Sequence, residues 1–94
     1  MQIVWTELAV RDLAAARAYI ARDNSPAADR QIERVLTAVD SLQRFPEIGR
    51  PGRRPGMREL VIDQTPYIAA YRLRGDAIEI LRVMHSRQRW PDTF

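Results

Sequence analysis

All the positive charge of this 94-residue chain comes from arginine, and over half of the arginines fall in two short segments. Five lie between Arg44 and Arg58 against one acid, and three lie between Arg82 and Phe94 against one acid. A guanidinium group presents a planar fork of donors that binds carboxylates and phosphates at two points. A genome of high GC content would explain the absence of lysine but not the clustering. The two segments therefore predict contact with an anionic partner.

Histidine exchanges protons readily near neutral pH, and the chain has only one, His85. It is the natural candidate for a general acid or base. Cysteine is absent, which excludes disulfides and thiolate zinc sites, and one histidine cannot build a multi-histidine metal site. We therefore expect neither a metal nor a cofactor.

Length and composition predict a single domain spanning residues 1–94, because 46% of the residues are hydrophobic and the chain is too short for two cores. A net charge of +3 favours nucleic acid, acidic protein or anionic surfaces as partners. The first residues carry no basic stretch followed by an apolar run, and no eighteen successive residues are apolar. We expect a cytoplasmic protein that does not contact a membrane.

Two helices are predicted in the first half of the chain, after a short apolar strand at Gln2–Trp5. Thr6 can cap the first helix, which extends to about Arg22. Ser25 followed by Pro26 marks the start of the second helix, which extends to about Arg44. Apolar residues recur at helical spacing in both segments: Ala9, Leu13, Ala16 and Ile20, then Ala28, Ile32, Val35, Val39 and Leu42.

The second half of the chain begins with a loop, Phe45–Met57, that holds three of the six prolines and three of the four glycines. Three apolar runs follow, separated by short turn sequences: Arg58–Ile62, Tyr67–Leu73 and Ala77–Met84. The order predicts an α+β fold with an N-terminal strand, a two-helix hairpin and then a three-stranded antiparallel sheet. The helices would cover one face of the sheet and leave the other accessible.

Strict alternation assigns faces to the last two strands. It puts Tyr67, Ala69, Tyr71 and Leu73 on one face of their strand, and Ile78, Ile80, Arg82 and Met84 on one face of the final strand. Arg82 is then either exposed or a buried ion-pairing residue bound to a carboxylate such as Glu59 or Glu79.

Nearly the whole chain resembles the RelE/ParE superfamily of bacterial type II toxins. The resemblance is carried by the order of elements and by these residues: Trp5, Ala9, Asp12-Leu13, Tyr19-Ile20, Ala27-Ala28, Ile32, Pro46, Gly49-Arg50, Gly52, Gly56, Arg58-Glu59-Leu60, Pro66-Tyr67, Tyr71-Arg72 and Ile80-Leu81-Arg82-Val83-x-His85-x-Arg87-x-x-Trp90-Pro91. It implies a growth-inhibiting, plasmid-stabilising toxin that a cognate antitoxin wraps and silences in a hetero-oligomer. A basic domain with an uncovered sheet face also suits an acidic, partly disordered partner that folds on binding.

The superfamily has two target classes: RelE-like members cut messenger RNA on the ribosome, and ParE-like members poison DNA gyrase. RelE-like enzymes place basic side chains on the second and third strands, where this chain aligns Glu59, Val61 and Ile68. A carboxylate and two aliphatic side chains cannot stabilise a phosphorane. Of the basic positions of RelE-like enzymes, this chain keeps only those at the C-terminus, near Arg87 and Arg89. The ending His85-x-Arg87 also resembles the ParE branch, which we therefore favour.

Each target class implies its own site residues. A gyrase-directed toxin would contact its target through Arg50, Arg53, Arg54, Arg89 and Trp90, unless the loop arginines merely solvate a Pro/Gly turn. The alternative, a metal-independent, ribosome-dependent mRNA endoribonuclease, would use Arg58, Arg82, His85 and Arg87 for catalysis, with His85 as acid or base. A third possibility is a degenerate toxin that persists only as a binding partner.

The aromatic residues Tyr67, Tyr71 and Trp90 could stack on nucleic-acid bases. Packing is the favoured role for both tyrosines because they share a face with Ala69 and Leu73. For Trp90, we expect that the side chain pins the C-terminal tail onto the sheet.

Overall fold

The computed structural model describes residues 1–91. A strand is followed by two helices, a short 3-10 helix and four more strands. Their bounds are β1 (Gln2–Trp5), α1 (Glu7–Ala21), α2 (Ser25–Asp40), η1 (Ser41–Gln43), β2 (Arg50–Pro51), β3 (Met57–Val61), β4 (Tyr67–Arg74) and β5 (Ala77–His85).

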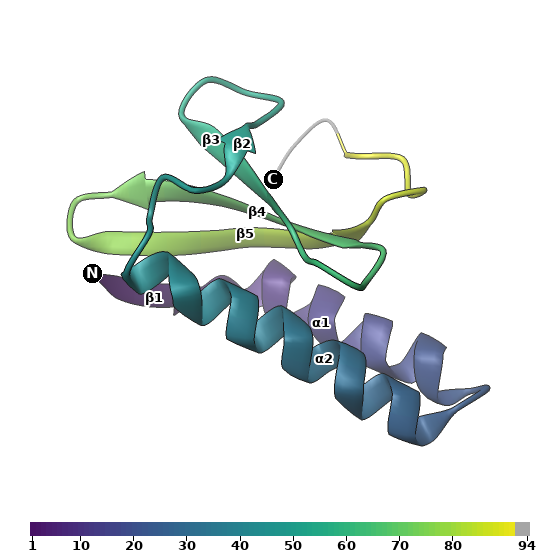
Figure 1. Cartoon of the computed structure of the whole chain (residues 1–94). Helices are drawn as coiled ribbons and strands as arrows, with labels where there is room; N and C mark the ends of the chain where they lie inside the picture. The colour runs from purple at the N-terminus through teal and green to yellow at the C-terminus, as the bar shows by residue number, and fades with distance from the viewer. Residues whose placement is uncertain (92–94) are drawn as a thin grey trace.

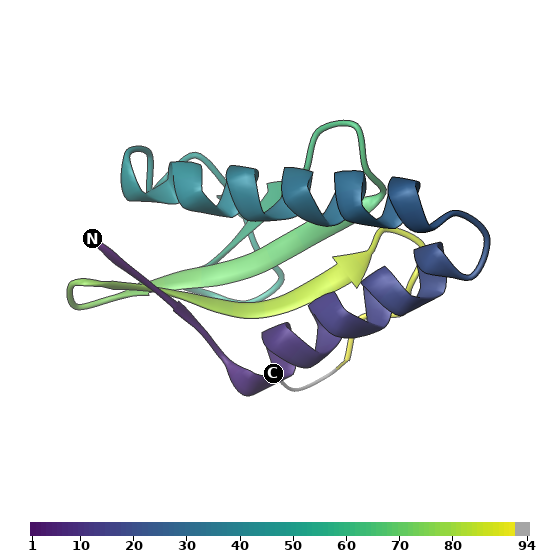
Figure 2. The same ribbon diagram turned by 90° about the horizontal axis from the view of Figure 1, so that it is seen from below.

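The strands form one five-stranded sheet in the order β1-β5-β4-β3-β2. Both helices lie against the same face of this sheet (Figures 1 and 2). The predicted α+β fold and the three antiparallel strands β3, β4 and β5 are confirmed. The prediction of a three-stranded sheet is wrong, because β1 joins it parallel to β5 and the two-residue β2, inside the predicted loop, pairs with β3.

Side-chain caps mark where both helices begin. The Thr6 hydroxyl accepts a hydrogen bond from the Ala9 amide at 3.3 Å, as the sequence predicts, and also donates to the Ile80 carbonyl at 2.8 Å. The second cap differs from the prediction: Asn24 accepts from the Ala27 amide at 3.0 Å, and Ser25 already lies in the first turn. Asn and Ser are equally good caps, so composition alone could not choose between them.

The main core lies between the helices and the sheet face they cover, and Tyr71 is fully buried in it. Its hydroxyl accepts from the Gly49 amide at 2.9 Å and donates to the Pro46 carbonyl at 2.8 Å. A Cβ on Gly49 would lie 2.7 Å from the Tyr71 ring, closer than van der Waals contact permits. Tyr71 thereby fixes the loop between η1 and β2 against the core.

A β-bulge interrupts β5 at Leu81. Ala70 is paired with Arg82 and Tyr71 with Ile80, so Leu81 is an extra residue on its strand. Ile80 and Val83 both enter the main core as a result, whereas Leu81 joins a second apolar cluster. The alternation predicted for the final strand is therefore wrong beyond Ile80, whereas the predicted alternation of β4 is confirmed.

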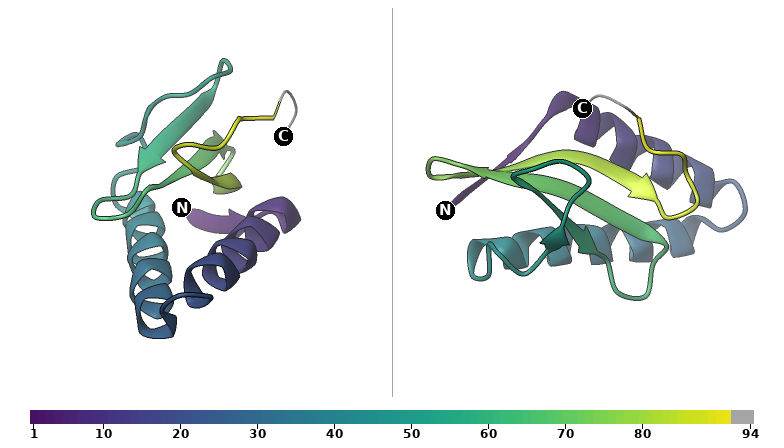
Figure 3. Two further views of the ribbon diagram at one scale, coloured as in Figure 1. Left: turned by 90° about the vertical axis from the view of Figure 1, so that its right-hand side faces the viewer. Right: turned by 90° about the horizontal axis from the view of Figure 1, so that it is seen from above.

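The face of the sheet turned away from the helices is called the outer face here. Trp90 packs there against an apolar cluster of Met57, Ala70 and Leu81. The Arg53 guanidinium lies 4.6 Å from the centroid of the Trp90 ring. Figure 3 shows the C-terminal segment on the side of the sheet opposite the helices. The expectation that Trp90 pins the tail is confirmed, and the expectation of an uncovered outer face is wrong where the tail lies on it.

Within residues 1–91, neither α-helix has the length and apolar character needed to span a bilayer.

Candidate functional site

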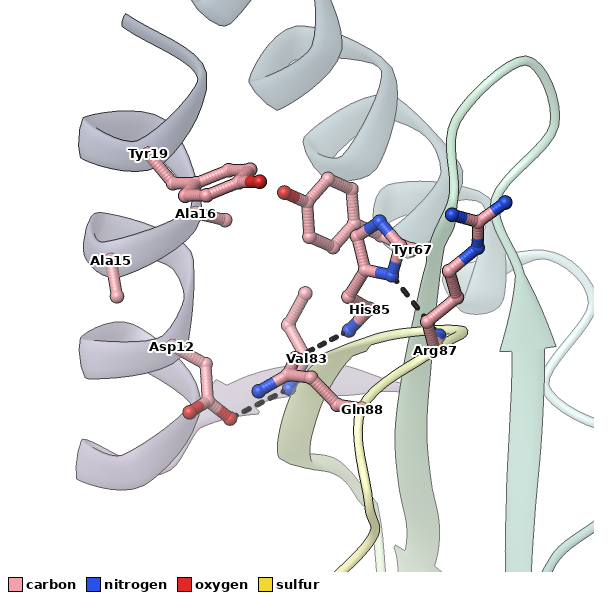
Figure 4. A pocket seen from close by; sticks show the side chains of 9 residues that line it. All are labelled: Asp12, Ala15, Ala16, Tyr19, Tyr67, Val83, His85, Arg87 and Gln88. Carbon is pink, nitrogen blue, oxygen red and sulfur yellow. Dashed lines mark hydrogen bonds between the residues drawn. The ribbon is translucent and has the colours of Figure 1, made fainter. Parts of the chain in front are cut away.

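A groove with a volume of about 550 Å³ lies between α1 and the end of the sheet where β4 begins and β5 ends. The pairing of Tyr67 with His85 brings these two strand ends side by side. Figure 4 shows the nine lining residues: Asp12, Ala15, Ala16 and Tyr19 from α1, then Tyr67, Val83, His85, Arg87 and Gln88.

Hydrogen bonds from the turn that follows β5 hold His85 in place. Its Nδ1 accepts from the Arg87 amide at 3.0 Å, and its own amide donates to the Gln88 side chain at 2.7 Å. An accepting Nδ1 assigns the proton of the neutral imidazole to Nε2. The ring meets Tyr67 edge-on, with centroids 5.5 Å apart. The turn and Tyr67 together fix the orientation of the His85 ring.

Two tyrosines stand at one end of the groove, with their hydroxyl groups directed toward one another (Figure 4). Burial raises the pKa of Tyr67, and the neighbouring Tyr19 raises it further. The Tyr67 hydroxyl therefore stays protonated at neutral pH and can donate a hydrogen bond to a bound group.

Arg82 lies beside the groove in a two-point ion pair with Asp12. Its Nε and one terminal nitrogen lie 2.7 and 3.0 Å from the two carboxylate oxygens, and Asp12 also accepts from the Val83 amide at 2.9 Å. The bond to Asp12 raises the pKa of Arg82 above its ordinary value. The prediction of an ion-pairing Arg82 is confirmed, but the suggested partners are wrong: Glu59 pairs with Arg50 and Arg53, and Glu79 pairs with Arg72. The bulge changes the direction of β5 just before Arg82, which alternation could not anticipate.

Arg58 is directed to the loop that Tyr71 anchors. It donates to the carbonyls of Glu47 and Gly49 at 3.1 and 3.0 Å. Of the four residues assigned to the ribonuclease alternative, His85 and Arg87 line the groove. Arg82 lies beside it in the pair with Asp12, and Arg58 lies elsewhere.

The structure brings three of the five predicted target-binding residues together on the outer face. Arg50 donates twice to one oxygen of Glu59, at 3.1 and 3.0 Å, and Arg53 lies 3.6 Å from the other oxygen. A cavity of about 400 Å³ is lined by Arg50, Arg53 and Trp90 among others. Arg54 lines a neighbouring cavity, and Arg89 is exposed on the tail.

Sequence reasoning gave no role to three groove residues, Asp12, Tyr19 and Gln88. A signal existed for Asp12: it follows Ala9 by three residues and precedes Ala16 by four, which places a carboxylate on the buried stripe of α1. Such a carboxylate requires a buried partner. Among residues 1–91, no three His, Asp or Glu side chains lie together as metal ligands.

The chain is similar in sequence and in fold to known proteins. The sequence profile described as "ParE toxin of type II toxin-antitoxin system, parDE" matches residues 3–90. The chain is 49% identical over 93 residues to Y4kP of Sinorhizobium fredii, covering 99% of this chain and 96% of that protein. It is 40% identical over 85 residues to toxin RelE2 of Caulobacter vibrioides, covering 90% and 94%.

A solved structure has the same fold. It is described as the chromosomal ParDE TA system from P. aeruginosa, with a TM-score of 0.83, 31% identity, and coverage of 90% of this chain and 95% of that one. The profile match spans most of the chain, and both named relatives exceed 30% identity. The chain therefore belongs to the ParE toxin family of type II toxin-antitoxin systems.

Proposed function

We propose that this toxin inhibits growth by acting on DNA gyrase, as ParE-like toxins do, and that it has no nuclease activity of its own. The observation that carries the proposal is the scarcity of positive charge around His85. Metal-free RNA cleavage needs a proton acceptor, an acid and positive charge at the phosphorane. Among residues 1–91, Arg87 is the one cation that lines the groove with the histidine. Arg82 is bound to Asp12 and Arg58 to loop carbonyls.

The strand positions where RelE-like enzymes carry basic groups support the same proposal. Glu59 is buried between Arg50 and Arg53, and Val61 is 53% exposed on the outer face. Neither side chain can stabilise negative charge on phosphorus. A toxin that acts by binding does not need such charge.

We further propose that a cognate antitoxin covers the toxin in a hetero-oligomer. The likeness to a solved ParDE system supports this. A physical reason is the apolar surface that α1 leaves in solvent, with Leu8 and Tyr19 41% and 64% exposed. Burial of these side chains against a partner would remove apolar surface from water, which stabilises the complex.

The second candidate is a RelE-like, ribosome-dependent endoribonuclease. Two observations favour it: His85 is held with Nε2 as its proton-bearing nitrogen, and a relative named RelE2 is 40% identical. Under this alternative, His85 and Arg87 would perform the chemistry in the groove.

Purified toxin tested against gyrase and against translating ribosomes separates the two. We expect inhibition of supercoiling and no cuts in the ribosomal A-site codon. The His85→Gln variant should retain most of its effect on gyrase. Cuts at A-site codons that His85→Gln slows by about 10²–10⁴-fold would establish the ribonuclease instead.

A degenerate toxin would give a third pattern. Neither assay would respond, and cells expressing the chain without an antitoxin would grow normally. That pattern would overturn both candidate activities.

A further inference from the structure

The arginines of the outer face are arranged differently from those elsewhere in the chain. Strand register puts Arg50 and Arg72 on this face, beside Glu59 and Glu79. The set of outer-face arginines is Arg50, Arg53, Arg54, Arg72 and Arg74. In the described part of the chain, these five cations share the face with two glutamates, an excess of three.

The two glutamates lie deeper than the arginines that they bind. Glu59 is 5% exposed, whereas Arg50 and Arg53 are each 55% exposed. Glu79 is 20% exposed, and its partner Arg72 is 43% exposed. A macromolecule that approaches this face therefore meets guanidinium groups before carboxylates. Each glutamate also restricts the side-chain conformations of the arginine that it binds. Less conformational entropy is therefore lost when that arginine binds a partner.

A cleft with a volume of about 520 Å³ lies among these side chains. Arg54, Arg72 and Arg74 line it together with apolar and backbone surface, and its lining contains no acidic side chain. Arg72 and Arg74 are alternate residues of one strand, so their Cα atoms are about 6.7 Å apart on the same face. The cleft presents neighbouring positive charges to a ligand with repeated negative charges.

We propose that the outer face, through Arg50, Arg53, Arg54, Arg72 and Arg74, binds the phosphate backbone of duplex DNA. This goes beyond the proposed action on gyrase and does not depend on it. Arginine forks match phosphate oxygens at two points, and such contacts bind a duplex without reading its sequence.

The aromatic residues favour a duplex over a single strand. Single-strand binders stack unpaired bases on free aromatic rings. Trp90 already has Arg53 over its ring and packs on the apolar cluster of the outer face. Tyr67 and Tyr71 lie in the core beneath the helices. In residues 1–91, the outer face thus offers donors for phosphates but no open stacking platform.

Fluorescence anisotropy of a labelled mixed-sequence duplex tests the proposal with the purified toxin. Each phosphate contact contributes about 0.9 to the slope of log K against log salt. With five contacts, the affinity should fall about 500-fold between 50 and 200 mM salt. The Arg54→Gln/Arg74→Gln variant keeps three contacts, so its affinity should fall only about 40-fold.

The matched control is Arg22→Gln/Arg30→Gln, which removes the same charge from exposed positions of the helical hairpin. It should keep the salt dependence of the parent, and circular dichroism should show that both variants fold. Equal effects of the two double substitutions would overturn the proposal, because net charge alone would then explain binding.

Two further probes distinguish duplex DNA from single-stranded DNA and from an acidic protein as the partner. A single strand of the same length should bind more weakly than the duplex, and polyglutamate of matched charge should not displace the duplex. Tighter binding of the single strand would overturn the assignment to duplex DNA. Displacement by polyglutamate would assign the face to an acidic protein instead.

Discussion

Tyr71 connects the core to the loop that carries the first arginine cluster. Its hydroxyl satisfies one donor and one acceptor of the loop backbone, at Gly49 and Pro46. Tyr71→Phe leaves both groups without this partner at a buried position, so we expect a loss of about 1–3 kcal/mol in the free energy of unfolding, measured by urea denaturation. Tyr19→Phe, at a position 64% exposed, is the matched control and should change stability little. Equal stability of both variants would contradict this role.

The buried tyrosines also predict how stability depends on pH. Burial raises the pKa of Tyr67 and of Tyr71 above 10.0, so above pH 10 the folded chain keeps protons that the unfolded chain releases. Their contribution to stability is fully present below pH 10 and is lost as the pH rises through the folded pKa values. Urea midpoints at pH 8 and pH 11 measure the loss. Between these two pH values, the urea midpoint of Tyr67→Phe should fall less than that of the parent. An identical fall would refute the role of the Tyr67 hydroxyl in this pH dependence.

At the scale of elements, Thr6 joins β5 to α1. It caps the helix through the Ala9 amide and donates to the Ile80 carbonyl, whereas Asn24 caps α2 at an exposed position. We expect Thr6→Ala to lower the free energy of unfolding by about 2 kcal/mol and Asn24→Ala by about 1 kcal/mol. Thermal or chemical denaturation of both variants checks the ranking. Equal losses would show that Thr6 acts only as a cap, and a larger loss for Asn24→Ala would contradict the ranking.

The sequence predicted most elements, because helix and strand periodicities are local. It could not place β1 beside β5 or reveal the two-residue β2, because an alternating pattern shows which side of a strand is buried but not which strand is its neighbour. The bulge at Leu81 has no local signal, since Ile80, Leu81 and Val83 are all apolar. The site was harder to predict, because its ion pair joins Arg82 to Asp12, which lies seventy positions away along the chain.

Across the whole molecule, charge is distributed unevenly between the two layers. Residues 6–43, which form the helical layer, hold five arginines against six acids, including the exposed pairs of Arg11 with Glu7 and Arg17 with Asp29. The five outer-face arginines instead outnumber the two glutamates that they accompany. A cation exchanger binds the most positive face of a protein. Arg54→Gln/Arg74→Gln should therefore elute at lower salt than Arg22→Gln/Arg30→Gln, although both have the same net charge. Co-elution would indicate a uniform surface.

The pairing of β1 with β5 has a consequence for synthesis of the toxin. Ile3 pairs with Ile78, so β1 leaves the ribosome well before its partner and can pair only when β5 has emerged. The α1–α2 hairpin can form early, because its contacts are local. The sheet, and with it the groove and the outer-face arginines, is completed only after β5 has been translated. A chain whose translation stops before β5 therefore has neither surface.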